Sequence, residues 1–207
     1  MAQYFVINAE NPQARLIKHS VEILRDGGVI AYPTDSSYAL GCMLGFKDAQ
    51  DRIRQIRQVD DSHLFTLICR NLSELAIYTQ VDNTQFRLLK ANTPGAYTYI
   101  LKATREVPRR LQHAKRSAVG IRVPNHAVVQ ALLDELGEPL LSMTLLLPGD
   151  DEPLNEAWEI RDRLEHNIDL VIDSVTGHAG PTTVIDLTGS TPVLIRQGAG
   201  NAAPFGL

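Results

Sequence analysis

The sequence predicts one α/β domain, in which helices pack on a twisted sheet of mixed parallel and antiparallel strands. Helical and strand patterns alternate along the chain, and several connections are long enough to be helical crossovers between parallel strands. No linker, internal repeat or low-complexity stretch divides the 207 residues, a length that suits one domain with a full core. We therefore expect a single domain over residues 1–207.

The first helix is expected after Asn11 and Pro12, which are typical of an N-cap followed by proline at the first helical position. Apolar residues then recur at helical spacing until Gly27 and Gly28, which end the helix. A buried strand over 29–33 follows.

Asp48 is expected to cap a second helix, on which Arg54 and Arg57 share one face. Asn71 and Asp82 are expected to cap two short helices. The remaining patterns predict strands at 64–69, 97–102, 118–123, 139–146, 168–173, 183–187 and 192–196, and helices at 126–136 and 155–166.

Two segments are expected to lie outside these elements, a surface loop over 148–155 and a tail over 197–207. Trp158 falls at helical spacing with its neighbours, which favours packing over a base-stacking role.

The composition, with 44% hydrophobic and 21% charged residues, is typical of a soluble globular protein. No apolar run approaches 18 residues and no secretion signal opens the chain, so we expect a cytoplasmic protein without a membrane segment. Cys42 and Cys69 lack metal-ligand spacing and are expected to be small buried hydrophobic residues. The histidines also lack ligand spacing and are expected at the surface or at helix ends, so no metal site is predicted.

The charge is unevenly distributed, although the net charge is only −4. Basic residues gather between 102 and 122, and acidic residues between 150 and 173. The basic segment has two interpretations, a solvated face or a surface for double-stranded RNA or tRNA. Four residues would form the RNA surface, and their phosphate contacts would make binding sensitive to salt: Arg109, Arg110, Lys115 and Arg116.

The most informative segment is 27–42, where a buried strand runs into a polar loop. Pro33 fixes its own backbone and keeps the preceding residue extended, so the strand ends where Thr34, Asp35 and Ser36 begin. Polar side chains at a strand end are a usual location for a small-ligand site. Asp35 has two interpretations, a cap of its own turn or an orienting group for Mg²⁺.

Four strand-end segments share this character, because each places a hydroxyl or a guanidinium beside an apolar strand: 33–36, 94–98, 120–124 and 181–186. Hydroxyls, backbone N–H groups and arginines together suit a polyanion such as a nucleoside triphosphate. The chain contains neither a P-loop nor a dinucleotide-binding glycine fingerprint, so a nucleotide would be held in another way.

An ordered set of motifs resembles the YrdC-like threonylcarbamoyl-adenylate synthases, and most closely their YciO branch. The resemblance covers about residues 14–198, the core of the expected domain. Its carriers are Gly-Gly-x-x-x-Tyr-Pro-Thr-Asp-Ser at 27–36, Gly-Cys at 41–42, Pro-Gly-Ala-Tyr-Thr at 94–98, Gly-Ile-Arg-Val-Pro-Asn at 120–125, Thr-Thr-Val-Ile-Asp-Leu at 182–187 and Ile-Arg-Gln-Gly at 195–198.

The resemblance implies a YrdC/RibB-like fold with a concave basic surface, and an enzyme that joins L-threonine, bicarbonate and ATP. The products would be threonylcarbamoyl-AMP, used in a tRNA modification, and pyrophosphate, with Mg²⁺ expected as cofactor. It further implies that Thr34 contacts the threonine, Arg122 its carboxylate, and Arg196 the phosphates. The full set of candidate substrate and nucleotide ligands is Thr34, Ser36, Arg57, Arg122, Ser142, Thr144, Thr182 and Arg196, with Arg57, Thr34 and Arg122 as catalytic candidates.

The chain departs from this family at two positions on the nucleotide side. Val59 stands where the Lys-x-Arg motif has its second cation, and Leu146 stands where a Ser-x-Asn motif has its amide. Loss of one charge-assisted contact would cost about 1.5 to 3 kcal/mol. Arg54, one helical turn earlier, could supply the missing cation. Two functions stay open, a synthase of weakened activity and a non-catalytic nucleotide- or RNA-binding protein. The sequence does not predict the oligomeric state.

Overall fold

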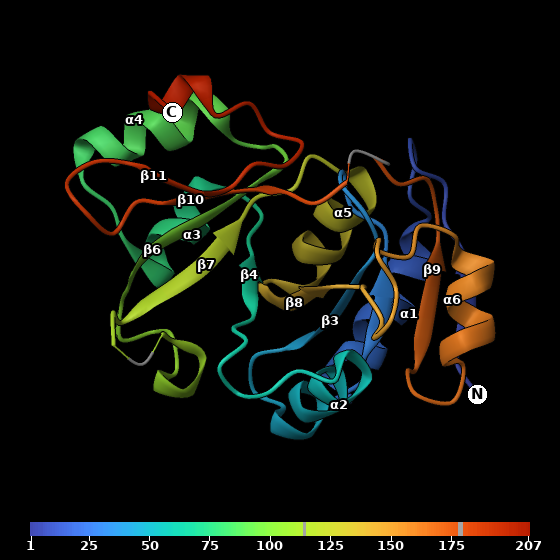
Figure 1. Cartoon of the computed structure of the whole chain (residues 1–207). Helices are drawn as coiled ribbons and strands as arrows, with labels where there is room; N and C mark the ends of the chain where they lie inside the picture. The colour runs from blue at the N-terminus through green and yellow to red at the C-terminus, as the bar shows by residue number, and fades with distance from the viewer. Residues whose placement is uncertain (114, 178–179) are drawn as a thin grey trace.

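A single twisted sheet runs through the whole molecule, as the computed structural model shows over residues 1–113, 115–177 and 180–207 (Figure 1). His178, one of the histidines considered above, lies outside these residues. The spatial order of the strands is β1-β9-β2-β3-β8-β4-β7-β6-β10-β11, and β5 pairs with β6. The strands are β1 Gln3–Val6, β2 Ile30–Tyr32, β3 Ala39–Met43, β4 Thr66–Ile68, β5 Thr79–Gln80, β6 Tyr97–Ala103, β7 Ala118–Arg122, β8 Leu140–Thr144, β9 Leu170–Asp173, β10 Thr183–Asp186 and β11 Val193–Arg196.

The sheet is mixed, as predicted. The pairs β1–β9, β2–β9, β4–β7 and β10–β6 are parallel, and the other pairs are antiparallel. The described residues also form six α-helices: α1 Ala14–Arg25, α2 Lys47–Arg57, α3 Leu72–Tyr78, α4 Asn83–Asn92, α5 Ala127–Leu136 and α6 Ala157–Leu164. The expected fold class is therefore confirmed.

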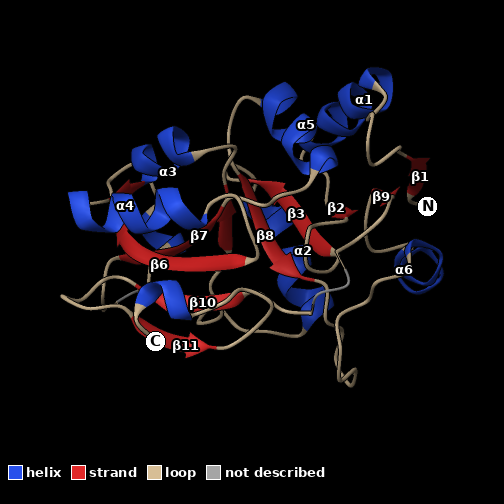
Figure 2. Ribbon diagram, turned by 90° about the horizontal axis from the view of Figure 1, so that it is seen from above, coloured by secondary structure: helices blue, strands red, loops and turns tan. Residues whose placement is uncertain are grey.

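Two apolar clusters form the core, because side chains alternate between the two faces of each strand. Helices α1 and α5 lie side by side on one face, where Val21 and Leu132 pack with Ile30 and Leu170 (Figure 2). The second cluster joins α2, α3, α4 and α6 to the opposite side chains of the strands, such as Ala31. None of the helices in the described residues is long and apolar enough to span a bilayer.

The helix boundaries confirm two predicted caps and correct two others. The side chains of Asn71 and Asp82 accept backbone N–H groups at the starts of α3 and α4. Asn11 does not cap α1, because the helix begins later, at Ala14, and Gln13 is its N-cap residue. The N–H of Asn11 donates to Asn8 Oδ1 in the preceding turn. Asp48 lies inside the first turn of α2, which is preceded by Phe46 and has no side-chain cap.

The second half of the sheet leaves one face open. In β6 and β7 alternate residues such as Tyr99 and Ile121 are buried in the core, whereas Thr98 and Gly120 face the opposite side. The open face of β4, β6, β7, β8 and β10 forms the floor of a cleft.

Two expectations at the surface were wrong. The segment 197–207 is not a free tail, because it turns back onto β6 and buries Phe205 against Tyr97 and Tyr99, with ring centroids 5.6 and 6.0 Å apart. Trp158 does not pack into the molecule, since 65% of its surface is exposed. Helical spacing alone did not show that this part of α6 faces the solvent.

Candidate active site

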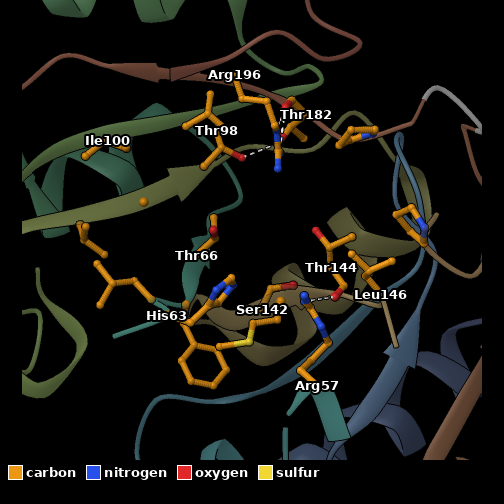
Figure 3. A pocket seen from close by; sticks show the side chains of 18 of the residues that line it. Arg57, His63, Thr66, Thr98, Ile100, Ser142, Thr144, Leu146, Thr182 and Arg196 are labelled. Atoms are coloured by element: carbon orange, nitrogen blue, oxygen red, sulfur yellow. Dashed lines mark hydrogen bonds between the residues drawn. The ribbon is translucent and has the colours of Figure 1, made fainter. Parts of the chain in front are cut away.

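A cleft of about 830 Å³ lies on the open face of the sheet, and side chains from several strands line it (Figure 3). Its floor carries Thr66, Thr98, Ile100 and Ser142. These positions are neighbours across the strands, since Thr66 pairs with both Gly120 and Ser142. The register of the sheet therefore converts single polar positions of separate strands into one continuous polar surface.

A recess of about 40 Å³ opens from this cleft and shares Thr66, Thr98, Ser142, Thr144 and Thr182 with it. The four strand-end segments of the sequence meet here. They contribute Thr34 and Ser36 from the first, Thr98 from the second, Arg122 from the third and Thr182 from the fourth. The structure thus brings six of the eight candidate ligands to the recess, and Arg57 and Arg196 to the cleft.

The loop after β2 is shaped by the hydroxyl of Thr34. Thr34 Oγ1 accepts the backbone N–H groups of Ser36 and Ser37 at 3.1 and 3.3 Å, and donates to the Ser37 carbonyl at 2.7 Å. Ser36 Oγ lies 3.0 Å from the same oxygen. Thr34 therefore caps its own turn and places the Ser36 hydroxyl at the recess.

Asp35 is not the cap of this turn, because both its carboxylate oxygens are used elsewhere. One accepts a guanidinium N–H of Arg122, and the other accepts the backbone N–H of Asn125 at 2.9 Å. Arg122 is 6% exposed, and burial lowers its pKa, an effect that the neighbouring Asp35 charge opposes. The ion pair holds the guanidinium in place at the wall of the recess.

Gly177 packs closely against the loop after β2. The N–H of Gly177 donates to the Thr34 carbonyl at 3.0 Å. A Cβ at position 177 would lie only 1.9 Å from the Asp35 carbonyl oxygen, so only glycine allows this approach. The hydroxyl of Tyr38, on the other side of the loop, donates to the carbonyls of Ile172 and Ser174 at 3.0 and 3.1 Å.

Two further arginines face each other across the cleft (Figure 3). Arg57, at the end of α2, donates to the Thr144 carbonyl, and Arg196, at the end of β11, donates to the Thr182 carbonyl at 2.9 and 3.2 Å. Neither forms an ion pair with a described residue. Burial lowers the pKa of both guanidinium groups, because water no longer solvates their charge fully.

Hydroxyl groups connect these cations. Thr98 Oγ1 lies 2.8 Å from Thr182 Oγ1, and the Tyr32 hydroxyl donates to Ser142 Oγ at 2.7 Å. Burial raises the pKa of Tyr32 to about 12, so its hydroxyl keeps its proton and directs the Ser142 oxygen. The site thus offers neutral donors and acceptors between fixed positive charges.

The structure shows where the two residues that differ from the family motifs, Val59 and Leu146, lie. The Val59 side chain packs against the core rather than entering the cleft, and Leu146 lines the cleft wall. Arg54 does not supply the missing cation, because it contacts Asp51 and Asp61 at 3.6 and 3.5 Å and stacks 5.0 Å from the centre of the Phe65 ring. Arg54 therefore does not replace the cation that is missing at position 59.

Sequence reasoning missed two cleft residues. His63 is exposed, as expected, but it also lines the cleft. Thr66 begins β4 and is the one polar residue in the apolar run 64–69, and this isolated polar position could have identified it as a residue of the open face. The turn that precedes β4 gave no comparable signal for His63, because its direction depends on how the chain leaves α2.

The basic segment divides into two parts. Arg116 is exposed, lines the cleft and pairs with Asp186 at 3.0 Å. Arg109 and Lys115 are exposed, and the exposed Arg110 donates to the Leu44 carbonyl at 3.2 Å. The contact surface for RNA stays a prediction.

The described residues offer few ligands for a divalent cation. They contain no group of three or more His, Cys, Asp or Glu side chains that could hold a metal. The carboxylates that line the cleft are Asp151 and Glu152. Such a pair fits Mg²⁺ only as a complex with substrate phosphates, which is the way this ion is often bound.

Comparison with known proteins places the chain in a family. A family model for Sua5, YciO and YrdC, described as "Telomere recombination", matches residues 22–198. The chain belongs to this Sua5/YciO/YrdC family, which defines its fold and confirms the resemblance of the sequence motifs.

Within the family the chain is a YciO-type member. It is 56% identical over 207 residues to the uncharacterized protein YciO of Escherichia coli K12, covering 99% of this chain and all of that one. The crystal structure of E. coli YciO matches with a TM-score of 0.92 over 99% of this chain and 100% of that chain.

More distant relatives carry names that state an activity or a ligand. A threonylcarbamoyl-AMP synthase of Vibrio vulnificus is 30% identical over 186 residues, which are 88% of this chain and 98% of the relative. P. abyssi Sua5, solved in complex with L-threonine, has a TM-score of 0.86 at 23% identity, over 94% of this chain and 57% of that chain. This second likeness concerns the fold.

Proposed function

We propose that this protein is an L-threonylcarbamoyl-adenylate synthase of lowered activity, which binds L-threonine at the recess and MgATP in the cleft. Bicarbonate is the third substrate, and the products are threonylcarbamoyl-AMP and pyrophosphate. The relationship to the V. vulnificus synthase supports this reaction, and the polarity of the site supports this division of substrates.

The observation that carries the proposal is the set of three arginines whose pKa burial lowers within the described part of the chain: Arg57, Arg122 and Arg196. All three line the connected recess and cleft. A bound anion would neutralise these charges, of which Arg122 is buried, Arg57 partly buried and Arg196 exposed, and arginine is well suited to carboxylate and phosphate oxygens. Arg122 suits the threonine carboxylate, and Arg57 and Arg196 suit the triphosphate.

The proposed chemistry needs little acid or base catalysis. The amine of threonine condenses with bicarbonate, a C–N bond forming as water leaves, and an oxygen of the resulting carbamate attacks the α-phosphorus of ATP. A new P–O bond forms, the bond between the α- and β-phosphates breaks, and pyrophosphate leaves with its electron pair. Charge increases at the phosphate oxygens during attack, so positioned guanidinium groups stabilise the transition state. The hydroxyls of Ser36 and Thr182 hold the threonine end in place.

Activity is expected to be lower than in a synthase with both nucleotide-side motifs complete. Leu146 lines the cleft where an amide would donate a hydrogen bond, and Val59 adds no charge. The residues expected to bind threonine, Thr34, Arg122 and Thr182, are all present, which argues for retained amino-acid binding. The residues missing from the nucleotide side would have made contacts that matter most in the transition state.

The test is pyrophosphate release from MgATP at high enzyme concentration, with threonine and bicarbonate each omitted in turn. The proposal expects slow release that needs both, and an AMP-linked product detected by mass spectrometry. Absence of release, or release that ignores threonine, would contradict it. In the Arg122→Gln variant, threonine should no longer stimulate pyrophosphate release, because the guanidinium proposed to bind the threonine carboxylate is removed.

A further inference from the structure

His63 occupies the part of the cleft where the phosphates are proposed to bind. It follows the end of α2 by six residues, on the turn that leads into β4, and its ring enters the cleft on the side that also carries Arg57 (Figure 3). The same connection, residues 58–65, contains Val59, whose side chain packs against the core instead. One segment therefore lacks the expected cation at one position and presents an ionisable ring at another.

We propose that His63 is a third ligand of the nucleotide's phosphate groups, which becomes cationic by taking up a proton as the nucleotide binds. The inference rests on the proposed nucleotide site and adds to it a residue that the motif comparison does not assign. A protonated imidazole beside a polyphosphate donates a charge-assisted hydrogen bond, as the guanidinium of an arginine would.

The surroundings of the ring explain why the proton arrives with the ligand. Burial and the positive charges of Arg57 and Arg54 lower the pKa of His63, and Asp60 on its own turn opposes them. The other charged or ionisable side chains that line the cleft are Arg116, His113, Arg196, Asp151 and Glu152. Without ligand, the ring is neutral at pH 7.

A polyphosphate reverses the main electrostatic contribution. Its negative charge neutralises Arg57 and favours the charged imidazole, so the pKa of His63 rises when the ligand is bound. By linkage, the affinity of the nucleotide then rises as the pH falls through the interval between the free and the bound pKa. A shift of one pKa unit corresponds to about a tenfold change in affinity across that interval.

The first experiment is calorimetric titration of MgATP into the wild type and into His63→Gln at pH 6 and pH 8. Two buffers of different ionisation enthalpy report the protons taken up. The wild type should gain about three- to tenfold in affinity relative to His63→Gln on going from pH 8 to pH 6. It should also take up more protons than the variant near pH 6.5, and the titration of ATP itself cancels in this comparison.

His113→Gln is the matched control, because His113 lines the same cleft but its Nδ1 accepts the backbone N–H of Lys115 at 3.3 Å. This variant should keep the proton uptake of the wild type. Equal proton uptake by the wild type and His63→Gln would overturn the role of His63 while leaving the nucleotide site intact. If the wild type binds no ATP at either pH, the proposed function fails, and the inference fails with it.

NMR titration of the wild-type histidine ring protons gives a second readout that needs no variant. The resonance of His63 should titrate below the ordinary range in the free protein, and at a higher pH with saturating MgATP. An unchanged titration midpoint in the bound protein would overturn the inference even if His63→Gln fails to fold.

Discussion

At the residue scale, the properties of the site depend on whether a carboxylate neutralises the charge of each arginine. Arg122 is paired with Asp35, whereas the described partners of the cleft arginines are neutral: Arg57 donates to the Thr144 carbonyl, and Arg196 donates to the carbonyl and hydroxyl of Thr182. Neutral oxygens satisfy an N–H without cancelling the charge, so each of these two guanidinium groups keeps a positive charge that a polyanion can neutralise. The arrangement fits an amino acid held at the recess and phosphates held outside it.

Leu146→Asn is expected to strengthen MgATP binding, because an amide at the cleft wall restores a hydrogen-bond donor. The expected gain is about 0.5 to 1.5 kcal/mol, or roughly 2- to 10-fold in Kd. Leu64→Asn places the same side chain elsewhere on the cleft wall and serves as the matched control, with no gain expected. Calorimetry that finds equal affinities in wild type and Leu146→Asn would refute the importance of the missing amide.

The two cysteines should be inert in the native protein. Burial raises the pKa of Cys42 to about 12 and that of Cys69 well above its ordinary value. Because the thiolate is the reactive form, only about one Cys42 in ten thousand is reactive at pH 8. A thiol reagent should therefore label neither residue at pH 8 and both in denaturant. Rapid labelling of the native protein would contradict this burial.

At the scale of the elements, the end of α1 sets the position of β2, and hence of the loop that follows it. The N–H groups of Gly27 and Gly28 donate to the carbonyls of Leu24 and Ile23, and Gly27 has φ +83°. The sequence predicted this end from the two glycines alone. The beginnings of α1 and α2 were less predictable, because a nearby turn competes with Asn11 and no side chain caps α2.

Gly27→Ala is expected to destabilise the fold by about 1 to 2 kcal/mol through its left-handed backbone, with a further cost from Phe46. A Cβ at position 27 would lie 2.9 Å from that ring. Gly137→Ala is the matched control, because Gly137 has φ +79° but no atom within 4 Å of its Cβ position. Urea unfolding should give a larger loss for Gly27→Ala, and a larger loss for Gly137→Ala would contradict the role of Phe46.

The segment between β6 and β7 allows a separate test of the RNA alternative. Within the described residues Arg116 pairs with Asp186, whereas Arg109, Arg110 and Lys115 form no ion pair. Neutralising these three to Gln should lower any double-stranded RNA affinity and flatten its salt dependence, whereas Arg116→Gln should have a smaller effect because Asp186 already compensates its charge. Filter binding at two salt concentrations measures both. RNA affinity that is indifferent to all four changes would exclude this segment as the contact surface.

At the scale of the whole molecule, the sheet brings distant segments together. Thr34, Thr98, Arg122 and Thr182 come from four separated motifs and meet at one recess, as their shared strand-end character predicted. The sequence could not predict which strand faces form the cleft floor, because that depends on the order of strands in the sheet. For this reason Thr66 was not recognised as a cleft residue.

The most direct test of the central claim is calorimetric titration of MgATP, with threonine and bicarbonate present, into the wild type and Arg57→Gln/Arg196→Gln. Each lost charge-assisted contact is worth about 1.5 to 3 kcal/mol, so the double variant should bind more than 100-fold more weakly. Arg87→Gln is the control, since Arg87 donates only within its own helix, to Asn83. ATP binding in the wild type that disappears in the double variant, together with threonylcarbamoyl-AMP in the wild-type sample, is the predicted result. Equal ATP affinity in the two proteins, or none in the wild type, would contradict the account.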